Sequence, residues 1–340
     1  MKAILAAAAL LTALAGVVRY ASGVSHVLAF IVATLALAAL ASLVSLSIEQ
    51  VGRRLGPAAT GLLQATVGNL PEFFVVIFAL NAGAHTVAQN AILGSILVNA
   101  LLVLGLVIVA GALKARDGIM RFSPRLPNDT ATLLLVASFI IILVGLTHGR
   151  HSKTISIVGA IVILLVYATW LRQYLMSDDL PERDETPPRL KQLHAISLLV
   201  LAGTASAFVS DWFIHALGPT IKTLHISQAF AGLVIVAIAG NAVENVSGIV
   251  LAAKGNSELA ISIVKNSVGQ IAAFLYPLLV LVSLLTATTL TFSLAPVYIG
   301  ALLGTSVIVW QITGDGEATL FEGTALIATF VILATVAAFE

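Results

Sequence analysis

The 340-residue sequence contains no cysteine and little charge: Asp, Glu, Lys and Arg together make up 10% of it, and its net charge is +1. The absence of cysteine excludes disulfides and thiolate metal sites. The near-zero net charge gives no basis for nucleic acid as a partner. What the chain has instead is a 59% share of hydrophobic residues, which predicts a bilayer protein without a soluble domain.

Apolar runs long enough to cross a hydrocarbon core of about 30 Å recur along the whole chain. The eleven predicted spans lie near residues 2–18, 24–48, 56–80, 85–112, 129–148, 154–171, 195–217, 226–253, 258–285, 290–312 and 318–339. Lipid forces backbone groups to pair within each segment, so we expect an all-α polytopic membrane protein. The first run could instead be a signal peptide, because Ala13-Leu14-Ala15 resembles a cleavage site; its removal would leave ten spans in the same orientation.

The basic residues of the predicted loops set the orientation. One side carries twelve of them: Lys2, Arg53, Arg54, Lys114, Arg116, Arg121, Arg125, Arg172, Arg183, Arg189, Lys191 and Lys254. The other side carries four: Arg19, Arg150, Lys153 and Lys222. Basic loops stay in the cytoplasm, which places the N-terminus inside and, with an odd number of spans, the C-terminus outside. In a prokaryote the membrane would be the plasma membrane.

A polar, proline-containing stretch from Asp178 to Gln192 separates two halves of comparable length. The predicted divisions are an N-terminal helix (1–23), a first five-helix repeat (24–172), an acidic cytoplasmic linker (173–194) and a second five-helix repeat (195–340). The linker acids are Asp178, Asp179, Glu182, Asp184 and Glu185. They could sense calcium or simply form a solvated face.

Two short polar interruptions, Gly68–Glu72 and Gly240–Glu244, match each other at an offset of 172 residues. The same offset places Ser95 on Ser267 without a gap. Five spans per repeat is an odd number, so the second repeat must enter the membrane from the opposite side. Such inverted repeats are typical of secondary transporters, whose ion sites lie near the bilayer midplane.

Each interruption places an asparagine three residues before a glutamate, so both side chains share one helix face. A carboxylate deep in a bilayer usually marks an ion path. Gly68, Pro71 and Gly240 can loosen the helices and free backbone carbonyls. Carboxylate, amide and carbonyl oxygens together suit a hard divalent cation, Ca²⁺ above Mg²⁺ or a transition metal. The predicted metal site comprises Glu72, Glu244, Asn69, Asn241, Gly68, Gly240, Ser95, Asn99, Ser267 and Gln270.

Several of these residues also have a purely structural interpretation. The glutamates could be held in buried hydrogen bonds, and the polar residues of the fourth and ninth spans, Asn90 included, could link neighbouring helices. Five further residues are possible accessories to cation or proton entry: Gln89, Glu49, Asp211, Glu322 and Lys265. Glu49 and Asp211 lie near span ends and could simply meet water. The Lys265 side chain is expected to point away from Ser267 and Gln270, towards a carboxylate or the interface.

Cation transport is coupled to proton transport if the two glutamates exchange a divalent cation for protons. Burial favours the neutral carboxyl and a bound dication favours the carboxylate, so one shared site gives antiport. One proton per glutamate would give two protons per Ca²⁺. The sequence has no Gly-rich phosphate-binding loop, which argues against an ATP-driven pump. No catalytic residues and no cofactor are expected. A passive cation channel and a membrane scaffold remain the alternatives from other classes.

The chain resembles the calcium/proton exchanger family of the calcium/cation antiporter superfamily. Beyond the two glutamate motifs, the residues that carry this resemblance are Ser47–Gln50, Arg54–Gly56, Leu62–Thr66, Gln89, Leu93–Gly105, Ala229–Leu233, Gly314–Gly316 and Glu322-Gly323. The resemblance covers about residue 45 to the C-terminus. It implies that Glu72 and Glu244 bind calcium and carry protons, and that a gating bundle of the second and seventh spans moves against a core of the other repeat helices.

Two features depart from that family's pattern. The ninth span reads Asn266-Ser267-Val268-Gly269-Gln270 where the family usually has Gly-Ser-Ser-x-Gln, and Lys265 replaces an apolar residue before it. Leu70-Pro71 is similar to the Leu-Pro-Glu of sodium/calcium exchangers, which makes a sodium-coupled exchanger of the same fold the nearest alternative. Sodium sites would be expected to add hydroxyls and a further acid in the fourth and ninth spans, and Asn99, Ser267 and Gln270 provide no acid there.

Overall fold

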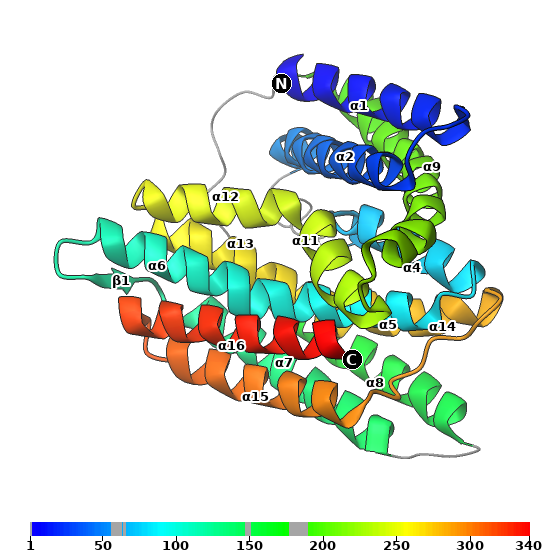
Figure 1. Ribbon diagram of the computed structural model, residues 1–340. Coiled ribbons are helices and arrows are strands. Elements are labelled where there is room, and N and C mark those ends of the chain that lie inside the picture. Colours follow the sequence, from blue (N-terminus) through cyan, green and yellow to red (C-terminus); the bar gives the residue numbers. More distant parts are fainter. Residues whose placement is uncertain (1, 56–62, 64–65, 147–150, 177–189) are drawn as a thin grey trace. The chain divides into compact units, whose positions relative to one another are not determined.

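The computed structural model describes residues 2–55, 63, 66–146, 151–176 and 190–340, and most of them are helical (Figure 1). The acids of the linker and the predicted start of the third span lie outside these residues. Contacts divide the chain into two compact units. The first unit is Met1–Ala82 with Ala168–Ile226, and the second is Gly83–Tyr167 with Ser227–Glu340. Each unit draws on both sequence halves, so this division differs from the predicted repeats, whose boundaries stay a prediction.

The first unit contains α1 (Lys2–Tyr20), α2 (His26–Leu55), α4 (Leu70–Asn81), α9 (Gln192–Leu224) and the last residues of α8 (Ser152–Leu175). Long apolar α2 packs along α9, and α1 lies against α2. Small residues permit this closeness: a side chain at Gly16 would stand 3.1 Å from the Trp212 ring. The rings of Phe30 and Phe213, 4.9 Å apart, fill the contact between α2 and α9.

The second unit contains the remaining elements. They are α5 (His85–Leu97), η1 (Val98–Val103), α6 (Leu104–Lys114), β1 (Ile119–Arg121), α7 (Arg125–Leu146), most of α8, α10 (Gln228–Phe230), η2 (Ala231–Val236), α11 (Ala237–Gly240), α12 (Ala242–Ala253), α13 (Ser257–Gln270), η3 (Ile271–Leu275), α14 (Tyr276–Val282), η4 (Ser283–Leu285), α15 (Pro296–Thr313), β2 (Glu317–Thr319) and α16 (Leu320–Phe339). Three of them, η1, η2 and η3, are π-helical turns within longer helices.

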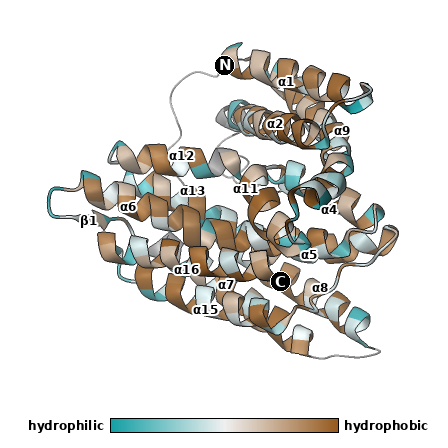
Figure 2. Cartoon of the chain, in the orientation of Figure 1, coloured by the Kyte–Doolittle hydropathy of each residue, from teal (hydrophilic) through white to brown (hydrophobic). Residues whose placement is uncertain are grey.

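Small residues bring the helices of the second unit into backbone contact. A Cβ atom at Gly94 of α5 would lie 2.2 Å from the Leu233 carbonyl oxygen of η2. One at Gly105 of α6 would lie 2.7 Å from the Gly323 carbonyl oxygen of α16. Without a strong hydrophobic drive between helices in lipid, such close backbone packing is a main source of their association. Figure 2 shows the helices dominated by apolar residues, as a bilayer environment requires.

Among the described residues, nine helices are long and apolar enough to cross a membrane, and a bent pair, Gln228–Gly240 with Asn245–Ala253, would make a tenth. They coincide with ten of the eleven predicted spans. The predicted span at 56–80 is represented by α4, a shorter apolar helix, because much of its first part lies outside the described residues. The helical membrane fold is thus confirmed, and the count of eleven stays a prediction.

The predicted start of the tenth span at residue 290 is wrong. The helix begins at Pro296, and the preceding segment is not helical. Leu290, Phe292 and Leu294 are buried at 1%, 0% and 3% exposure, while the residues between them are more exposed. This alternation is the period of an extended chain, which buries every second side chain. Three apolar residues therefore belong to a connecting segment that covers the helices, not to the helix itself.

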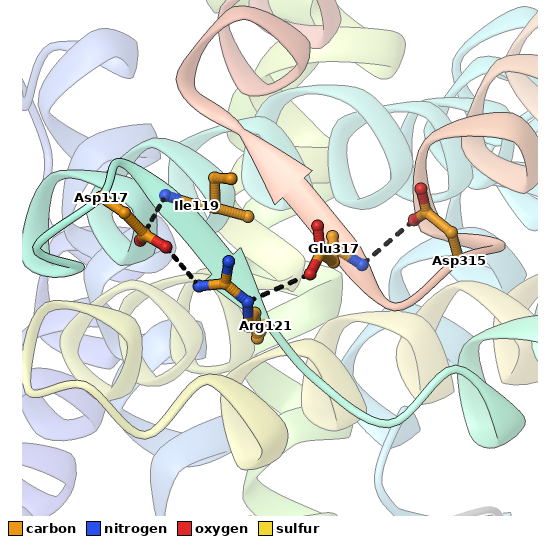
Figure 3. A network of polar contacts seen from close by, with 5 residues as sticks. All are labelled: Asp117, Ile119, Arg121, Asp315 and Glu317. Atoms are coloured by element: carbon orange, nitrogen blue, oxygen red, sulfur yellow. Dashed lines mark hydrogen bonds and ion pairs between the residues drawn. The ribbon is translucent and has the colours of Figure 1, made fainter.

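Two short strands also interrupt the predicted all-helical pattern. β1 and β2 pair antiparallel, with Met120 opposite Ala318. Arg121 joins the strands by a 3.1 Å ion pair to Glu317 and contacts Asp117 at 2.7 Å (Figure 3). The hydrogen bond from Arg121, with another from the Ile119 N–H, holds the pKa of Asp117 below its usual value, and Asp117 in turn raises the pKa of Arg121. The strands fasten the α6–α7 loop to the α15–α16 loop.

The elements around the two polar motifs repeat in register. Helices α4 and α12 begin at residues 70 and 242 and end at 81 and 253, so both ends differ by 172. Helices α5 and α13 begin at 85 and 257, and η1 and η3 end at 103 and 275, again 172 apart. The gapless offset read from the sequence therefore extends from the motif to the π-helical turn that follows.

Candidate functional site

The first motif forms the start of α4 in the first unit. Asn69 caps the helix with φ −96° and ψ 24°, and Pro71 occupies its first turn. Proline has no N–H, so the carbonyl of Val67 loses the donor that a continuous helix would supply. Glu72 follows as the third helical residue and is buried, with 8% exposure. The Asn69 amide nitrogen is also buried and has no hydrogen-bond partner among the described residues.

The second motif repeats this geometry at the start of α12 in the second unit. Asn241 has φ −98° and ψ 15°, nearly the values of Asn69. Glu244 is again the third residue of its helix. The chain bends by 60° between Gln228–Gly240 and Asn245–Ala253, as in a broken span or a re-entrant loop. A helix N-terminus carries partial positive charge that favours an anionic side chain, so Glu72 in the first turn of α4 stands where the helix dipole stabilises a carboxylate.

Ser95, Asn99 and Asn241 form a buried hydrogen-bonded group, which we call the asparagine cluster. The Asn99 amide donates to the Asn241 side-chain oxygen at 2.8 Å and to the Ser95 carbonyl at 2.9 Å. The Asn241 amide donates to the Ser95 hydroxyl at 3.0 Å and to the Ala237 carbonyl at 2.9 Å. These bonds fix the orientation of both amides, because every amide hydrogen has an acceptor. The break at Asn241 is thereby joined to the π-helical turn that carries Asn99.

Four buried side-chain oxygens on η1, α12 and α13 have no hydrogen-bond donor among the described residues. They belong to the side chains of Asn99, Asn245, Asn266 and Ser267. A buried acceptor without a donor costs about 1–3 kcal/mol, so water or a cation is expected to supply the missing contact. Amide and hydroxyl oxygens are ligands that Ca²⁺ accepts readily. The described residues contain no group of three or more His, Asp or Glu placed to hold a metal, so such a site would rely on these neutral oxygens beside its carboxylates.

The predicted site residues fall in both units. Asn69, Glu72 and Gly68 belong to the first unit, and the other predicted ligands belong to the second. Within the second unit the structure brings Ser95, Asn99 and Asn241 together; Ser267 and Gln270 are buried on α13 just before η3, and Gly240 ends α11. The pairing of Glu72 with Glu244 stays a prediction.

Asn245 and Asn266 were not among the predicted ligands, yet each has a free buried oxygen. Asn245 stands four residues after Asn241, and its N–H donates to the Asn241 carbonyl at 3.0 Å. That spacing places it on the same helix face as Asn241. The four-residue spacing from Asn241 is visible in the sequence and could have indicated Asn245 as a ligand.

Three of the predicted accessory residues have structural roles. The Gln89 amide donates to the Thr291 and Ser293 carbonyls at 3.2 and 2.7 Å and so holds the extended segment before α15. Glu322 caps its own helix by accepting from the Thr319 N–H at 2.7 Å. Lys265 is buried, with 1% exposure, and its ammonium donates to the Thr313 hydroxyl at 3.1 Å. The partner is a hydroxyl, where a carboxylate or the interface was expected.

The two remaining accessory residues are exposed. Glu49 lies near the end of α2, and Asp211 lies in α9. Both belong to the first unit. Asp211 lies well inside α9 and not near its end, so contact with water at a span end stays a prediction for it, as does a part in cation entry for both residues.

Replacing Asn99 by leucine is expected to lower ion flux per folded molecule at least about tenfold, because the Asn241 oxygen loses its donor at a cost of about 1–3 kcal/mol. The matched control is Asn90→Leu, on the same helix and also buried but outside the asparagine cluster. Flux into reconstituted vesicles should be divided by the folded fraction from size-exclusion chromatography. Unchanged flux per folded Asn99→Leu molecule would reduce the asparagine cluster to a structural role.

Comparison with known proteins identifies what the chain is similar to. A family model described as sodium/calcium exchanger protein matches residues 25–173 and 194–339. The vacuolar calcium ion transporter of Schizosaccharomyces pombe is 30% identical over 318 residues, covering 89% of this chain and 77% of the relative. The Ca²⁺/H⁺ antiporter ChaA of Bacillus subtilis is also 30% identical over 318 residues, covering 90% of each. The solved structure of the Ca²⁺/H⁺ antiporter protein YfkE superposes with a TM-score of 0.81, at 28% identity, over 99% of both chains.

Proposed function

The chain belongs to the sodium/calcium exchanger protein family, and from that premise we propose that it is a secondary antiporter that exchanges Ca²⁺ for protons by alternating access. The observation that carries the proposal is the repeated start of α4 and α12. Each has a helix break, an asparagine cap of the same backbone geometry and a glutamate in the first turn. Discontinuous helices at matched positions of two repeats are typical of the ion sites of secondary transporters.

In this proposal Glu72 and Glu244 are the shared binding groups for Ca²⁺ and protons. A dication between two carboxylates keeps both ionised, and its departure leaves two negative charges in a low-dielectric site, which favours protonation. The two glutamates would titrate as a pair and carry two protons for each Ca²⁺. The buried oxygens of Asn99 and Ser267, which have no donor among the described residues, support a role as neutral ligands that complete the coordination.

The proposed moving part is a gating bundle of α2 and α9, the predicted second and seventh spans, which both lie in the first unit. The packing of α2 along α9 supports this pairing, although the same unit also contains α1, α4 and the last residues of α8. The asparagine cluster lies wholly within the second unit, so its geometry need not change when these two helices move. The proposed cycle therefore keeps one part of the ligand set fixed.

We place the protein in the cell membrane, with its N-terminus in the cytoplasm and its C-terminus outside. Contacts within the second unit support the assignment of loops to faces. β1 pairs with β2, and the Ser123 N–H donates to Glu258 at 2.7 Å, so three loops predicted on the cytoplasmic side meet. On the opposite side the Phe292 N–H donates to Ser156 at 3.2 Å. The loop charge count then decides which face is cytoplasmic.

Flux measurements with separate driving gradients test the exchange of protons for Ca²⁺. In vesicles containing the purified protein, a pH gradient should drive Ca²⁺ accumulation, and a sodium gradient of the same size should not. The reason is that Asn99, Ser267 and Gln270 provide no acid at positions where a sodium site would be expected to add one. Accumulation driven by sodium alone would replace this proposal with a Na⁺/Ca²⁺ exchanger. Flux that follows the Ca²⁺ gradient without proton movement would indicate a channel.

A further inference from the structure

A cavity of about 220 Å³ lies within the first unit, between α1, α2 and α9. Its polar lining consists of Arg19 and His26, with Trp212 and His215 on α9, and the rest of its wall is alanine and valine. The cavity is smaller than the roughly 300–1,000 Å³ typical of sites for whole organic ligands. It has room for a compact group such as a phosphate with its nearest substituents.

The charge of this lining is of one sign. Arg19 is cationic, the two histidines can donate hydrogen bonds, and no carboxylate lines the cavity. The Arg19 Nε is buried and has no hydrogen-bond partner among the described residues, and no described acid forms an ion pair with this side chain. A buried guanidinium N–H without an acceptor is costly, so an anionic ligand is expected to supply one. Guanidinium groups match phosphate oxygens in a bidentate arrangement.

The position of the cavity indicates where its ligand comes from. Arg19 lies in the last turn of α1, and His26 is the first residue of α2, so the cavity opens at the ends of two predicted spans. Tyr20 and Trp212 meet there edge to face with ring centroids 6.3 Å apart. Tyrosine and tryptophan gather at the level of lipid headgroups, which is also the level of their phosphates.

The same two helices expose apolar side chains beside this polar end. Leu14 and Val17 of α1 are 43% and 65% exposed, and Leu28 of α2 is 50% exposed. In a bilayer these residues face acyl chains. A ligand that joins an anionic head to hydrocarbon chains would satisfy both the cavity and its surroundings, whereas a free anion would use the cavity alone.

We propose that this cavity binds the phosphate of an anionic phospholipid headgroup through Arg19, His26 and His215. Arg19 supplies the charge, the histidines supply further donors, and Trp212 forms an apolar wall beside the glycerol region. The cavity shares no lining residue with the proposed metal site, and the proposal does not depend on the exchange of Ca²⁺ for protons.

Lipid retention by the full-length protein tests the proposal. The protein is purified from vesicles of mixed phosphatidylglycerol and phosphatidylcholine, and bound lipid is counted by native mass spectrometry. Wild type should retain phosphatidylglycerol in preference to phosphatidylcholine, and Arg19→Gln should lower that retention about tenfold, because hydrogen bonds to a charged group are lost. Arg172→Gln, which removes an exposed arginine that does not line the cavity, should retain the lipid like wild type.

Competition with millimolar inorganic phosphate tests whether the bound phosphate group belongs to a lipid headgroup or to a free anion. A lipid site should keep its phosphatidylglycerol under these conditions. Displacement by inorganic phosphate would overturn the lipid assignment, and equal retention of both lipids, or full retention by Arg19→Gln, would overturn the anion site. If Arg19→Gln does not fold, His215→Gln tests the same cavity from α9 and should weaken retention in the same direction.

Discussion

Replacing Glu72 or Glu244 by glutamine is expected to abolish Ca²⁺-dependent proton flux in everted vesicles. Glutamine keeps the size and polarity of the side chain but neither neutralises a dication nor releases a proton. Losing one charged ligand of a buried ion costs on the order of 3 kcal/mol, so flux should fall at least about a hundredfold in either variant. The measurement uses a pH-sensitive dye and a Ca²⁺ pulse at matched protein content.

The matched control for both glutamate variants is Glu317→Gln. That carboxylate lies in β2, is half exposed and pairs with Arg121, outside the proposed site. Its loss should leave flux within about twofold of wild type, since exposed ion pairs contribute about 0–1 kcal/mol. Normal flux in Glu72→Gln or in Glu244→Gln would remove that residue from the mechanism.

Replacing Gly94 by alanine should prevent the second unit from packing. The new methyl group would meet the Leu233 carbonyl oxygen at 2.2 Å and two further backbone atoms of that residue at 2.6 Å. Backbone cannot rotate away as a side chain can, so we expect a loss of about 3 kcal/mol or more, at the upper end of overpacking effects. Thermal unfolding in detergent should show a large fall in Tm or no folded protein.

Gly304→Ala is the control for Gly94→Ala, because a Cβ atom at Gly304 meets nothing within 4 Å. Alanine is the better helix former by about 1 kcal/mol, so this variant should be as stable as wild type or more so. A wild-type Tm for Gly94→Ala would show that the α5–η2 contact is looser than its geometry indicates.

Much of this arrangement could be predicted from the sequence because the bilayer restricts the possibilities. Long apolar runs predicted the helices, and Gly68, Pro71 and Gly240 predicted where two of them loosen or break; α4 and α12 begin there. Ser95, Asn99 and Asn241 were predicted as ligands of one site, and the structure brings these three side chains together. These predictions were possible because they depend on local periodicity and on a motif that occurs twice, at an offset of 172 residues.

What could not be predicted depends on contacts distant in the sequence. The π-helical turns at Val98–Val103 and Ile271–Leu275 lie within long, mainly apolar helices, so the hydrophobic pattern does not distinguish them from α-helix. The segment with Leu290 and Phe292 is predicted as helix, because the periodicity of a short apolar run does not distinguish a helix from an extended segment. Its extended form depends on Gln89, some 200 positions earlier, which holds its carbonyls. The β1–β2 pairing likewise joins residues far apart in the chain.

The equal spacing of α4, α5 and η1 with α12, α13 and η3 bears on how this chain arose. If one ancestral segment was duplicated, substitutions have since changed most of its side chains, as at Leu93 and Lys265, which occupy corresponding positions. Over the same stretch neither copy has gained or lost a residue relative to the other. A single inserted residue would turn everything beyond it by about 100° around the helix axis. On that account, this part of the gene has accepted many substitutions but no insertion or deletion.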